Sequence, residues 1–175
     1  EHSPDTDTHD VPIRGIDSLP AELDDWQQLL NGVPLTVPAG TCRRVLIDLE
    51  RYTCAYPLVS TRGGTGARVR MHWQESLYAT DGSGKGDRNA VEGKLFGRPD
   101  LPEDGPGDLF IAGGGEERHT TLWWEAGRYV EVLVSTSEEP LDITAIEFRS
   151  TTTPTTTPQR SPPRSLGWPR SPSWR

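Results

Sequence analysis

The apolar residues of this chain occur in short stretches, and this grouping constrains the fold more than any other feature. From residue 33 onward, clusters of Gly, Pro, Asp and Asn divide apolar stretches of five to nine residues. In the segment Ala67–Trp73, apolar residues alternate with polar ones, which is typical of a strand with one buried face. No helical pattern separates these stretches, so a parallel sheet with crossover helices is not expected. We predict an all-β domain over residues 33–150, an antiparallel β-sandwich or jelly roll.

Four further segments carry a strand pattern. Each is rich in β-branched or aromatic residues and is bounded by turn-forming residues. They are Val45–Leu49, Leu122–Trp124, Arg128–Ser135 and Leu141–Phe148.

One helical pattern precedes the predicted strands, over residues 18–32. Leu23, Trp26 and Leu29 recur at helical spacing, Ser18 is a candidate N-cap, and Asn31-Gly32 ends the pattern. We expect one short amphipathic helix here. Residues 1–17, which hold five acids and two prolines, are predicted to be a flexible acidic segment.

The last 25 residues, 151–175, differ in composition from the rest. They contain six Pro, ten Ser or Thr, four Arg and no acid, so they lack the apolar surface that would offset ordering, and we predict a disordered tail. Two functional alternatives are an O-glycosylated stalk and a polyproline-type ligand. A third explanation is a shifted reading frame, because 16 Arg against two Lys indicates GC-rich coding, and such a shift tends to yield Pro, Arg and Ser.

The charge balance excludes two classes of partner. The formal charge is −8, made up of +4 in the tail and −12 in residues 1–150. A body this acidic argues against nucleic acid or an anionic membrane as the main partner. No run of about 18 apolar residues is present, which excludes a transmembrane helix. The chain begins Glu-His-Ser, so we expect a fragment or a processed chain.

The long segment between Thr80 and Gly107 contains a partial match to a calcium-binding loop. Asp81, Ser83, Gly86 and Glu92 fall at positions 1, 3, 6 and 12 of that pattern, but Lys85 occupies position 5, where an oxygen ligand belongs. No cofactor is expected, and a looser calcium site is kept as an alternative. Its ligands would be Asp81, Asp87, Asn89 and Glu92.

Zinc and nucleophilic chemistry find no support in the sequence. The four histidines are scattered, and no nucleophile motif is present. His72 and His119 are predicted on the polar faces of their strands. Cys42 and Cys54 stand twelve apart and could meet across a hairpin, so a disulfide and two unrelated buried thiols both stay open.

Side chains suited to binding sugar cluster in the same long segment and at two neighbouring strands. Planar polar groups bind sugars through paired hydrogen bonds, and aromatic rings stack on their C–H faces. Trp73 is in phase with Val69 and Met71 and is expected in the core, whereas Trp123 and Trp124 are adjacent, so at most one of them can be core. The candidate sugar-binding residues are Glu75, Asp87, Arg88, Asn89, Glu92, Lys94, Trp123 and Trp124.

These motifs follow one another in a familiar order. The strand 45–49 is followed by Gly63-Gly64-Thr65-Gly66, by Glu75-Ser76-Leu77-Tyr78, by the stretch 84–94 (Gly-Lys-Gly-Asp-Arg-Asn-Ala-Val-Glu-Gly-Lys), and by Leu122-Trp123-Trp124 with Arg128-Tyr129. Over about residues 40–150 this order resembles the bacterial α-L-rhamnosidases. It resembles in particular their concanavalin-like β-sandwich (jelly-roll) domain, which precedes a helical (α/α)6 catalytic barrel.

The resemblance implies an accessory domain of an α-L-rhamnosidase-type glycoside hydrolase, cytoplasmic or secreted, which braces the catalytic barrel and contacts its sugar. The acids that hydrolyse the substrate in this family lie in the barrel, so this chain is not expected to be active alone. The alternative is an autonomous rhamnose- or carbohydrate-binding module, assisted by calcium in one version. The partners implied are a rhamnosyl-containing carbohydrate and a helical barrel domain that is missing from this chain.

Two departures from the family pattern stand out. Glu125-Ala126-Gly127 follows the Trp pair where the family usually has Arg, and the tail after Thr152 replaces the expected Tyr-Pro-containing linker.

Overall fold

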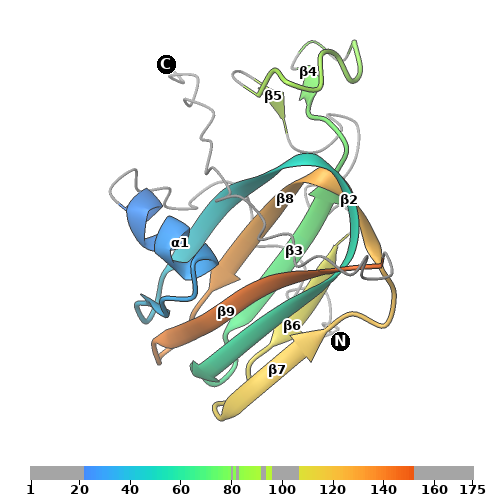
Figure 1. Cartoon of the computed structure of the whole chain (residues 1–175). Helices are drawn as coiled ribbons and strands as arrows, with labels where there is room; N and C mark the ends of the chain where they lie inside the picture. The colour runs from blue at the N-terminus through green and yellow to red at the C-terminus, as the bar shows by residue number, and fades with distance from the viewer. Residues whose placement is uncertain (1–21, 80, 82, 92–93, 96–106, 152–175) are drawn as a thin grey trace, which may run out of the picture.

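The computed structural model describes residues 22–79, 81, 83–91, 94–95 and 107–151. They form one curled antiparallel sheet of seven strands, one short helix and a separate two-stranded ribbon (Figure 1). The prediction of an all-antiparallel β fold with a short N-terminal helix is confirmed. Within the described residues, no second sheet packs face to face on the first, as a sandwich would require. The elements are α1 (Leu23–Leu30), β1 (Leu35–Val37), β2 (Cys42–Gly63), β3 (Arg68–Gln74), β4 (Tyr78–Ala79), β5 (Lys94–Leu95), β6 (Asp108–Ile111), β7 (Glu116–Thr120), β8 (Glu125–Ser135) and β9 (Leu141–Ser150).

The sheet curls because its longest strand, β2, is shared between two sets of neighbours. The first part of β2, up to Asp48, pairs with β8, which continues to β3 and β6. The second part, from Ala55 to Gly63, pairs with β9 on one side and with β7 on the other. Between the two parts the pairing with β8 shifts register at Asp48/Thr53. A bulge of this kind bends a strand, which here turns the sheet into a half-barrel.

The hydrophobic core fills the concave side of this half-barrel. In β3, Val69 and Met71 are fully buried and Trp73 is 7% exposed, so the predicted alternation and the core position of Trp73 are confirmed. The ring of Trp73 meets Phe148 of β9 edge-on, with 5.2 Å between ring centroids. The core therefore joins strands from both parts of the curled sheet.

Helix α1 covers one end of the core with Trp26 and Leu29, both buried. Its end is as predicted: Asn31 and Gly32 donate backbone hydrogen bonds to the last turn, and Gly32 takes a positive φ of 91°. Its start differs, because the N-cap residue is Glu22. The Glu22 carboxylate accepts hydrogen bonds from Nε of the buried Arg43 at 2.8 and 2.9 Å, which ties the helix to β2. Ser18, the predicted cap, lies outside the described residues.

The two strand histidines are less exposed than a polar-face position implies. His72 does lie on the face opposite the core, but it is 7% exposed. Burial, and then the positive charge of Arg70, lower its pKa to about 4. His119 turns inward instead and stacks on Phe110 of β6, with 5.6 Å between ring centroids. The prediction for His119 was wrong because β7 pairs with β2 in a register that sets His119 opposite the buried core residue Val59.

One further prediction needs correction, and one of the two alternatives for the cysteines is excluded. The segment Leu122–Trp124 is a turn between β7 and β8, not a strand. Cys42 and Cys54 both belong to the continuous strand β2 and are free thiols. Because no hairpin separates them, they cannot approach each other as a disulfide requires.

Candidate functional site

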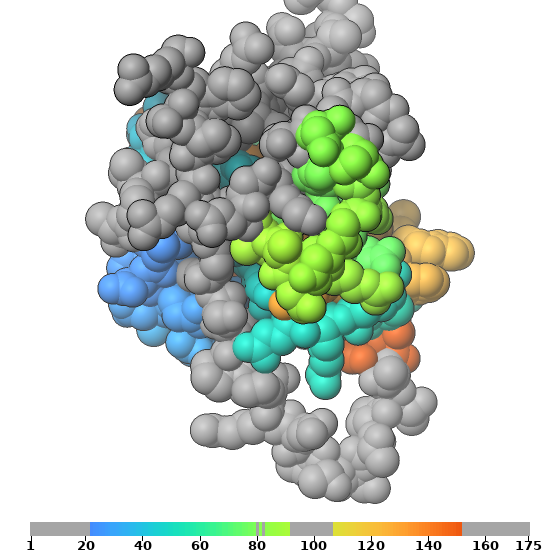
Figure 2. Space-filling model, turned by 90° about the horizontal axis from the view of Figure 1, so that it is seen from above, coloured from blue at the N-terminus to red at the C-terminus, as the bar shows by residue number. Residues whose placement is uncertain are grey.

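An open cleft of about 490 Å³ lies at the end of the molecule where β2 bends. Four of the predicted sugar-binding residues line it together, namely Glu75, Asp87, Arg88 and Asn89. Figure 2 looks down on this end, where the lime-green segment around residues 83–91 adjoins the teal residues of β2. The other lining residues are Glu50, Arg51, Tyr52, Gly86 and Arg128.

One wall of the cleft is the bulge of β2, formed by residues 49–52. Asp48 is paired with Tyr129 and Thr53 with Gly127, so these four residues face only Arg128 on β8. The backbone N–H of Glu50 donates to Asp48 Oδ1 at 2.7 Å, and Glu50 itself has a φ of 65°. The bulge thereby turns three polar or aromatic side chains away from the sheet and toward the cleft.

The floor of the cleft is organised by Arg128. Its Nε and Nη2 donate to the two carboxylate oxygens of Asp48, each at 2.8 Å, and Nη1 donates to Asn89 Oδ1 at 2.6 Å. The hydrogen bonds with Asp48 raise the pKa of Arg128, and burial opposes them. A two-pronged guanidinium–carboxylate pair fixes both orientation and position. Arg128 therefore joins the bent strand to the loop above it.

The opposite wall is the loop that contains residues 83–91. It is held by its own turns: Asp87 Oδ1 accepts the backbone N–H of Asn89 at 2.9 Å, and the hydroxyl of the buried Tyr129 donates to the carbonyl of Arg88. At its start, Ala79 donates to the carbonyl of Gly84 at 3.0 Å. Asn89 thus structures the loop with its backbone and positions Arg128 with its side-chain oxygen.

Glu75 closes the cleft at the end of β3. Its carboxylate pairs with Arg88 at 3.2 Å and with Lys85 at 3.8 Å. Both pairs are exposed to solvent, so each contributes at most about 1 kcal/mol to stability. These side chains can therefore exchange their partners for a ligand at little cost.

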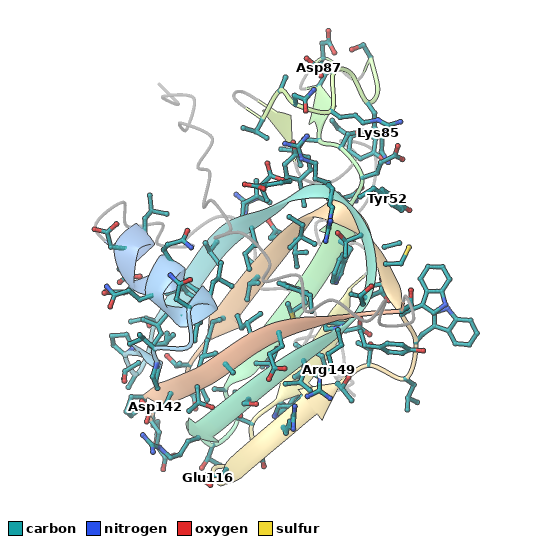
Figure 3. The ribbon with its side chains drawn as sticks, in the orientation of Figure 1. Tyr52, Lys85, Asp87, Glu116, Asp142 and Arg149 are labelled. Carbon is teal, nitrogen blue, oxygen red and sulfur yellow. The ribbon has the colours of Figure 1, made fainter. Side chains whose placement is uncertain are left out.

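The side chains of the bulge have few partners in the part of the chain that the structure describes. Among the described residues, Glu50, Arg51 and Tyr52 make no side-chain hydrogen bond or ion pair. Tyr52 is 55% exposed, and it lies at the same end of the molecule as Lys85 and Asp87 (Figure 3). The cleft thus combines a fixed floor with the Glu50 carboxylate, whose charge acts on Arg128 without a hydrogen bond. It also holds a guanidinium and an aromatic ring that make no hydrogen bond or ion pair with the described residues.

The calcium prediction finds only part of its ligand set in the described residues. Asp81 Oδ1 accepts the backbone N–H of Ser83 at 2.9 Å, and hydrogen bonding to Ser83 lowers the pKa of Asp81. Asp87 is likewise engaged with Asn89. The described residues hold no group of three or more His, Cys, Asp or Glu side chains arranged for a metal. Glu92 lies outside the described residues, as does the side chain of Lys94, so the calcium site stays a prediction.

Trp123 and Trp124, also predicted to contact sugar, lie outside the cleft. Both belong to the turn between β7 and β8, and they are 70% and 43% exposed. The neighbouring Leu122 is fully exposed. Neither tryptophan is part of the core.

The fold and the cleft define a class: an all-antiparallel β-domain whose bent central strand carries an open polar cleft. Within the described part of the chain, no helix has the length and apolarity needed to cross a membrane. Comparison with protein-family models, with curated proteins and with solved structures finds no match. The family resemblance accordingly rests on the sequence motifs.

Proposed function

We propose that this chain is a carbohydrate-binding β-domain that holds a sugar in the cleft at the bend of β2. The observation that carries the proposal is the cleft's composition. Three side chains that make no hydrogen bond or ion pair with the described residues, Glu50, Arg51 and Tyr52, stand over a floor fixed by Arg128. A prearranged floor lowers the entropic cost of binding, and the free groups supply the contacts.

The chemistry of these groups favours a neutral sugar. Carboxylate and guanidinium groups make paired hydrogen bonds with neighbouring hydroxyls, and an exposed tyrosine ring stacks on the C–H face of a sugar. The lining contains three carboxylates and three guanidinium groups, so its formal charge is balanced. A strongly charged ligand would gain no net attraction from this site.

The sequence resemblance supports a more specific form of the proposal. We propose that the sugar is rhamnosyl, that the domain is an accessory part of an α-L-rhamnosidase-type glycoside hydrolase, and that the curled sheet belongs to a jelly-roll sandwich. Support for the jelly roll comes from β2, which is shared between two sets of strands, as in a sandwich whose strands cross from one sheet to the other.

Isothermal titration of the full chain with L-rhamnose tests the proposal. Arg51→Ala removes a cleft donor that has no partner among the described residues. It should weaken binding about tenfold, because a hydrogen bond to a charged group contributes about 1.5–3 kcal/mol. Arg62→Ala is the matched control, since Arg62 is exposed and pairs with Asp142 outside the cleft. Equal affinities for the two variants, or no binding by the wild-type chain, would reject the cleft as a sugar site.

The exposed turn Leu122–Trp124 favours a second candidate function. Apolar residues exposed together mark surfaces that contact a partner. In this alternative the domain braces a helical catalytic barrel, and the turn packs against it. Absence of rhamnose affinity, together with protection of Trp123 and Trp124 in a complex with such a barrel, would favour bracing over sugar binding.

A further inference from the structure

Four exposed aromatic side chains lie along the outer side of β2 and the turn beside it. We call them the aromatic strip: Tyr52, Tyr56, Trp123 and Trp124, which are 55%, 37%, 70% and 43% exposed. Single exposed aromatic residues are common, but several together indicate a contact surface.

The strip is continuous with the cleft. Tyr52 lines the cleft, and Tyr56 follows four residues later in β2. Both side chains are exposed, and four residues of extended chain span about 13 Å. Ala55 pairs with Glu125, so the turn residue Trp124, which precedes Glu125, lies near the part of β2 that holds Tyr56. The Thr120 hydroxyl also donates to the Pro57 carbonyl at 3.0 Å and holds the turn against this part of β2.

Charged side chains border the strip. Tyr56 is paired with Arg149, whose guanidinium contacts Glu147 at 3.5 Å, and Glu147 also contacts Arg118 at 3.7 Å. Figure 3 shows Arg149 beyond the bend, on the lower part of the sheet from Tyr52. The four rings therefore form a narrow row next to the ion-paired side chains of Arg118, Glu147 and Arg149, not a broad apolar patch.

This arrangement distinguishes between classes of partner. A globular domain in stable contact covers a wide area with an apolar centre, which a single row of rings beside charges does not offer. Single-stranded nucleic acid also stacks on aromatic rings, but it needs a positive groove, and this chain carries a net charge of −8. A glycan chain has apolar sugar faces and hydroxyl-bearing edges, so it fits both the rings and their polar border.

We infer that the aromatic strip binds successive sugar units of a glycan chain whose end lies in the cleft. The inference rests on the proposed function and extends it: the ligand is an oligosaccharide or polysaccharide, bound along β2 from the cleft past Tyr52 toward Tyr56 and the tryptophan pair. Tyr52 then serves both parts of the site.

The test compares L-rhamnose with a rhamnose tetrasaccharide by isothermal titration of the full chain. The wild-type chain should bind the tetrasaccharide about tenfold more tightly than the monosaccharide. Each aromatic ring that stacks on a further sugar unit adds to the binding free energy. Trp124→Ala and Trp123→Ala should each reduce this ratio severalfold and leave monosaccharide affinity unchanged. Leu122→Ala is the matched control, because Leu122 is fully exposed in the same turn and has no ring. Unchanged melting temperatures establish that the variants fold.

The possible failures are distinguishable. If both sugars bind equally well to the wild-type chain, the strip is not a sugar platform, and the cleft remains the site. If neither sugar binds, the proposed function fails and the inference fails with it. A ratio that is unchanged in both tryptophan variants overturns the inference, as does Trp123-dependent binding to phosphatidylcholine vesicles without any effect of glycan length.

Discussion

At the scale of single residues, Glu50 connects strain with the candidate site. It is the one non-glycine residue with a positive φ among the described residues, at 65°. A side chain in this conformation costs about 1 kcal/mol relative to glycine. The bulge holds it there through the hydrogen bond from its N–H to Asp48, and the same geometry places its carboxylate in the cleft. Such strain is often found where a binding surface requires an unusual backbone.

We therefore expect Glu50→Gly to stabilise the fold and weaken the ligand site. Relief of the positive φ should raise the free energy of unfolding by up to about 1 kcal/mol, offset in part by the greater freedom of glycine in the unfolded chain. Loss of the carboxylate should weaken rhamnose binding severalfold. Denaturant unfolding and titration of the same variant measure both effects. A destabilised variant with unchanged affinity would show that Glu50 is only a structural residue.

Some of the cleft residues could be predicted from the sequence, and others could not. Asp87, Arg88 and Asn89 were predictable because they are close together in one loop between strands. Glu50 and Arg51 were not, because their position depends on the register of β2 against β8, which a single sequence does not state. The signal that was available is the run of polar and aromatic residues 50–53, which interrupts the apolar pattern between Leu49 and Ala55.

At the scale of elements, the tight connection from β2 to β3 depends on glycine. Gly64 has a φ of 62°, and a Cβ there would lie 2.7 Å from Leu141 Cδ1 and 3.0 Å from Leu141 Cα. Leu141 is fully buried, so it cannot move away without disturbing the core. Gly32, at the end of α1, also has a positive φ, but a Cβ there would meet nothing within 4 Å.

This contrast gives a matched pair of substitutions. Gly32→Ala should cost about 1 kcal/mol from its backbone alone, and Gly64→Ala about 2–4 kcal/mol because a clash is added. For a domain of this size, 1 kcal/mol corresponds to about 4 °C in melting temperature, so thermal unfolding separates the two variants. Equal shifts in melting temperature would mean that Leu141 moves away from the added Cβ at no cost, and that this side of the core is loosely packed.

The outer face of β3 should make stability depend on pH. The pKa of His72 is lowered from 6.5 to about 4 by burial and by Arg70, while Glu131, opposite it on β8, is paired with Arg44. Between these pH values the unfolded chain binds the proton more strongly than the folded protein. The contribution of neutral His72 to the free energy of unfolding is therefore fully present above pH 6.5. It is lost as pH falls toward 4 and amounts to about 3 kcal/mol in all.

His72→Gln isolates this contribution. Burial raises the pKa of both Asp108 and Glu125, which acts in the opposite direction as pH falls, so the comparison must be made between variant and wild type. The difference in unfolding free energy should change steadily between pH 6.5 and 4 and be constant above pH 7. A difference that does not vary with pH would show that His72 is protonated as easily in the folded protein as in the unfolded chain.

The elements themselves were predicted unevenly. The alternation in Ala67–Trp73 identified β3 and its inward face, because period two is visible in one strand. The 22-residue strand β2 was not foreseen, since Pro57 and the polar residues 50–53 suggest an interruption. The alternative in which Cys42 and Cys54 meet across a hairpin fails for the same reason, and the alternative of two separate thiols holds. Pairing across distant segments, such as Leu58 with Thr120, leaves no local trace in the sequence.

At the scale of the whole molecule, the chain should not hydrolyse a glycoside by itself. Hydrolysis needs two carboxyl groups at a fixed separation across the bond, one of them held protonated. In the cleft, Glu75 is paired with Arg88 and Asp87 caps its own loop. Asp108 and Glu125, the carboxyl groups whose pKa burial raises, do not line the cleft.

We expect no turnover of a chromogenic α-L-rhamnoside above the buffer rate. The loss of one catalytic group already costs several orders of magnitude. Two of the three carboxylates that line the cleft are engaged, Glu75 with Arg88 and Asp87 with the backbone of its own loop. Turnover that survives repurification and disappears in Glu75→Gln would place a catalytic site in this domain and contradict the binding role.

The most direct test of a sugar site at the bend of β2 is to map where the sugar binds. A ¹⁵N-labelled full chain is titrated with L-rhamnose, and the backbone amide resonances are followed by two-dimensional NMR. We predict saturable shifts at residues 50–52, 75, 86–89 and 128, which line the cleft, and none around the exposed pair of Arg62 and Asp142. Shifts that do not saturate, or that concentrate away from the bend of β2, would contradict the assignment of this cleft as the carbohydrate site.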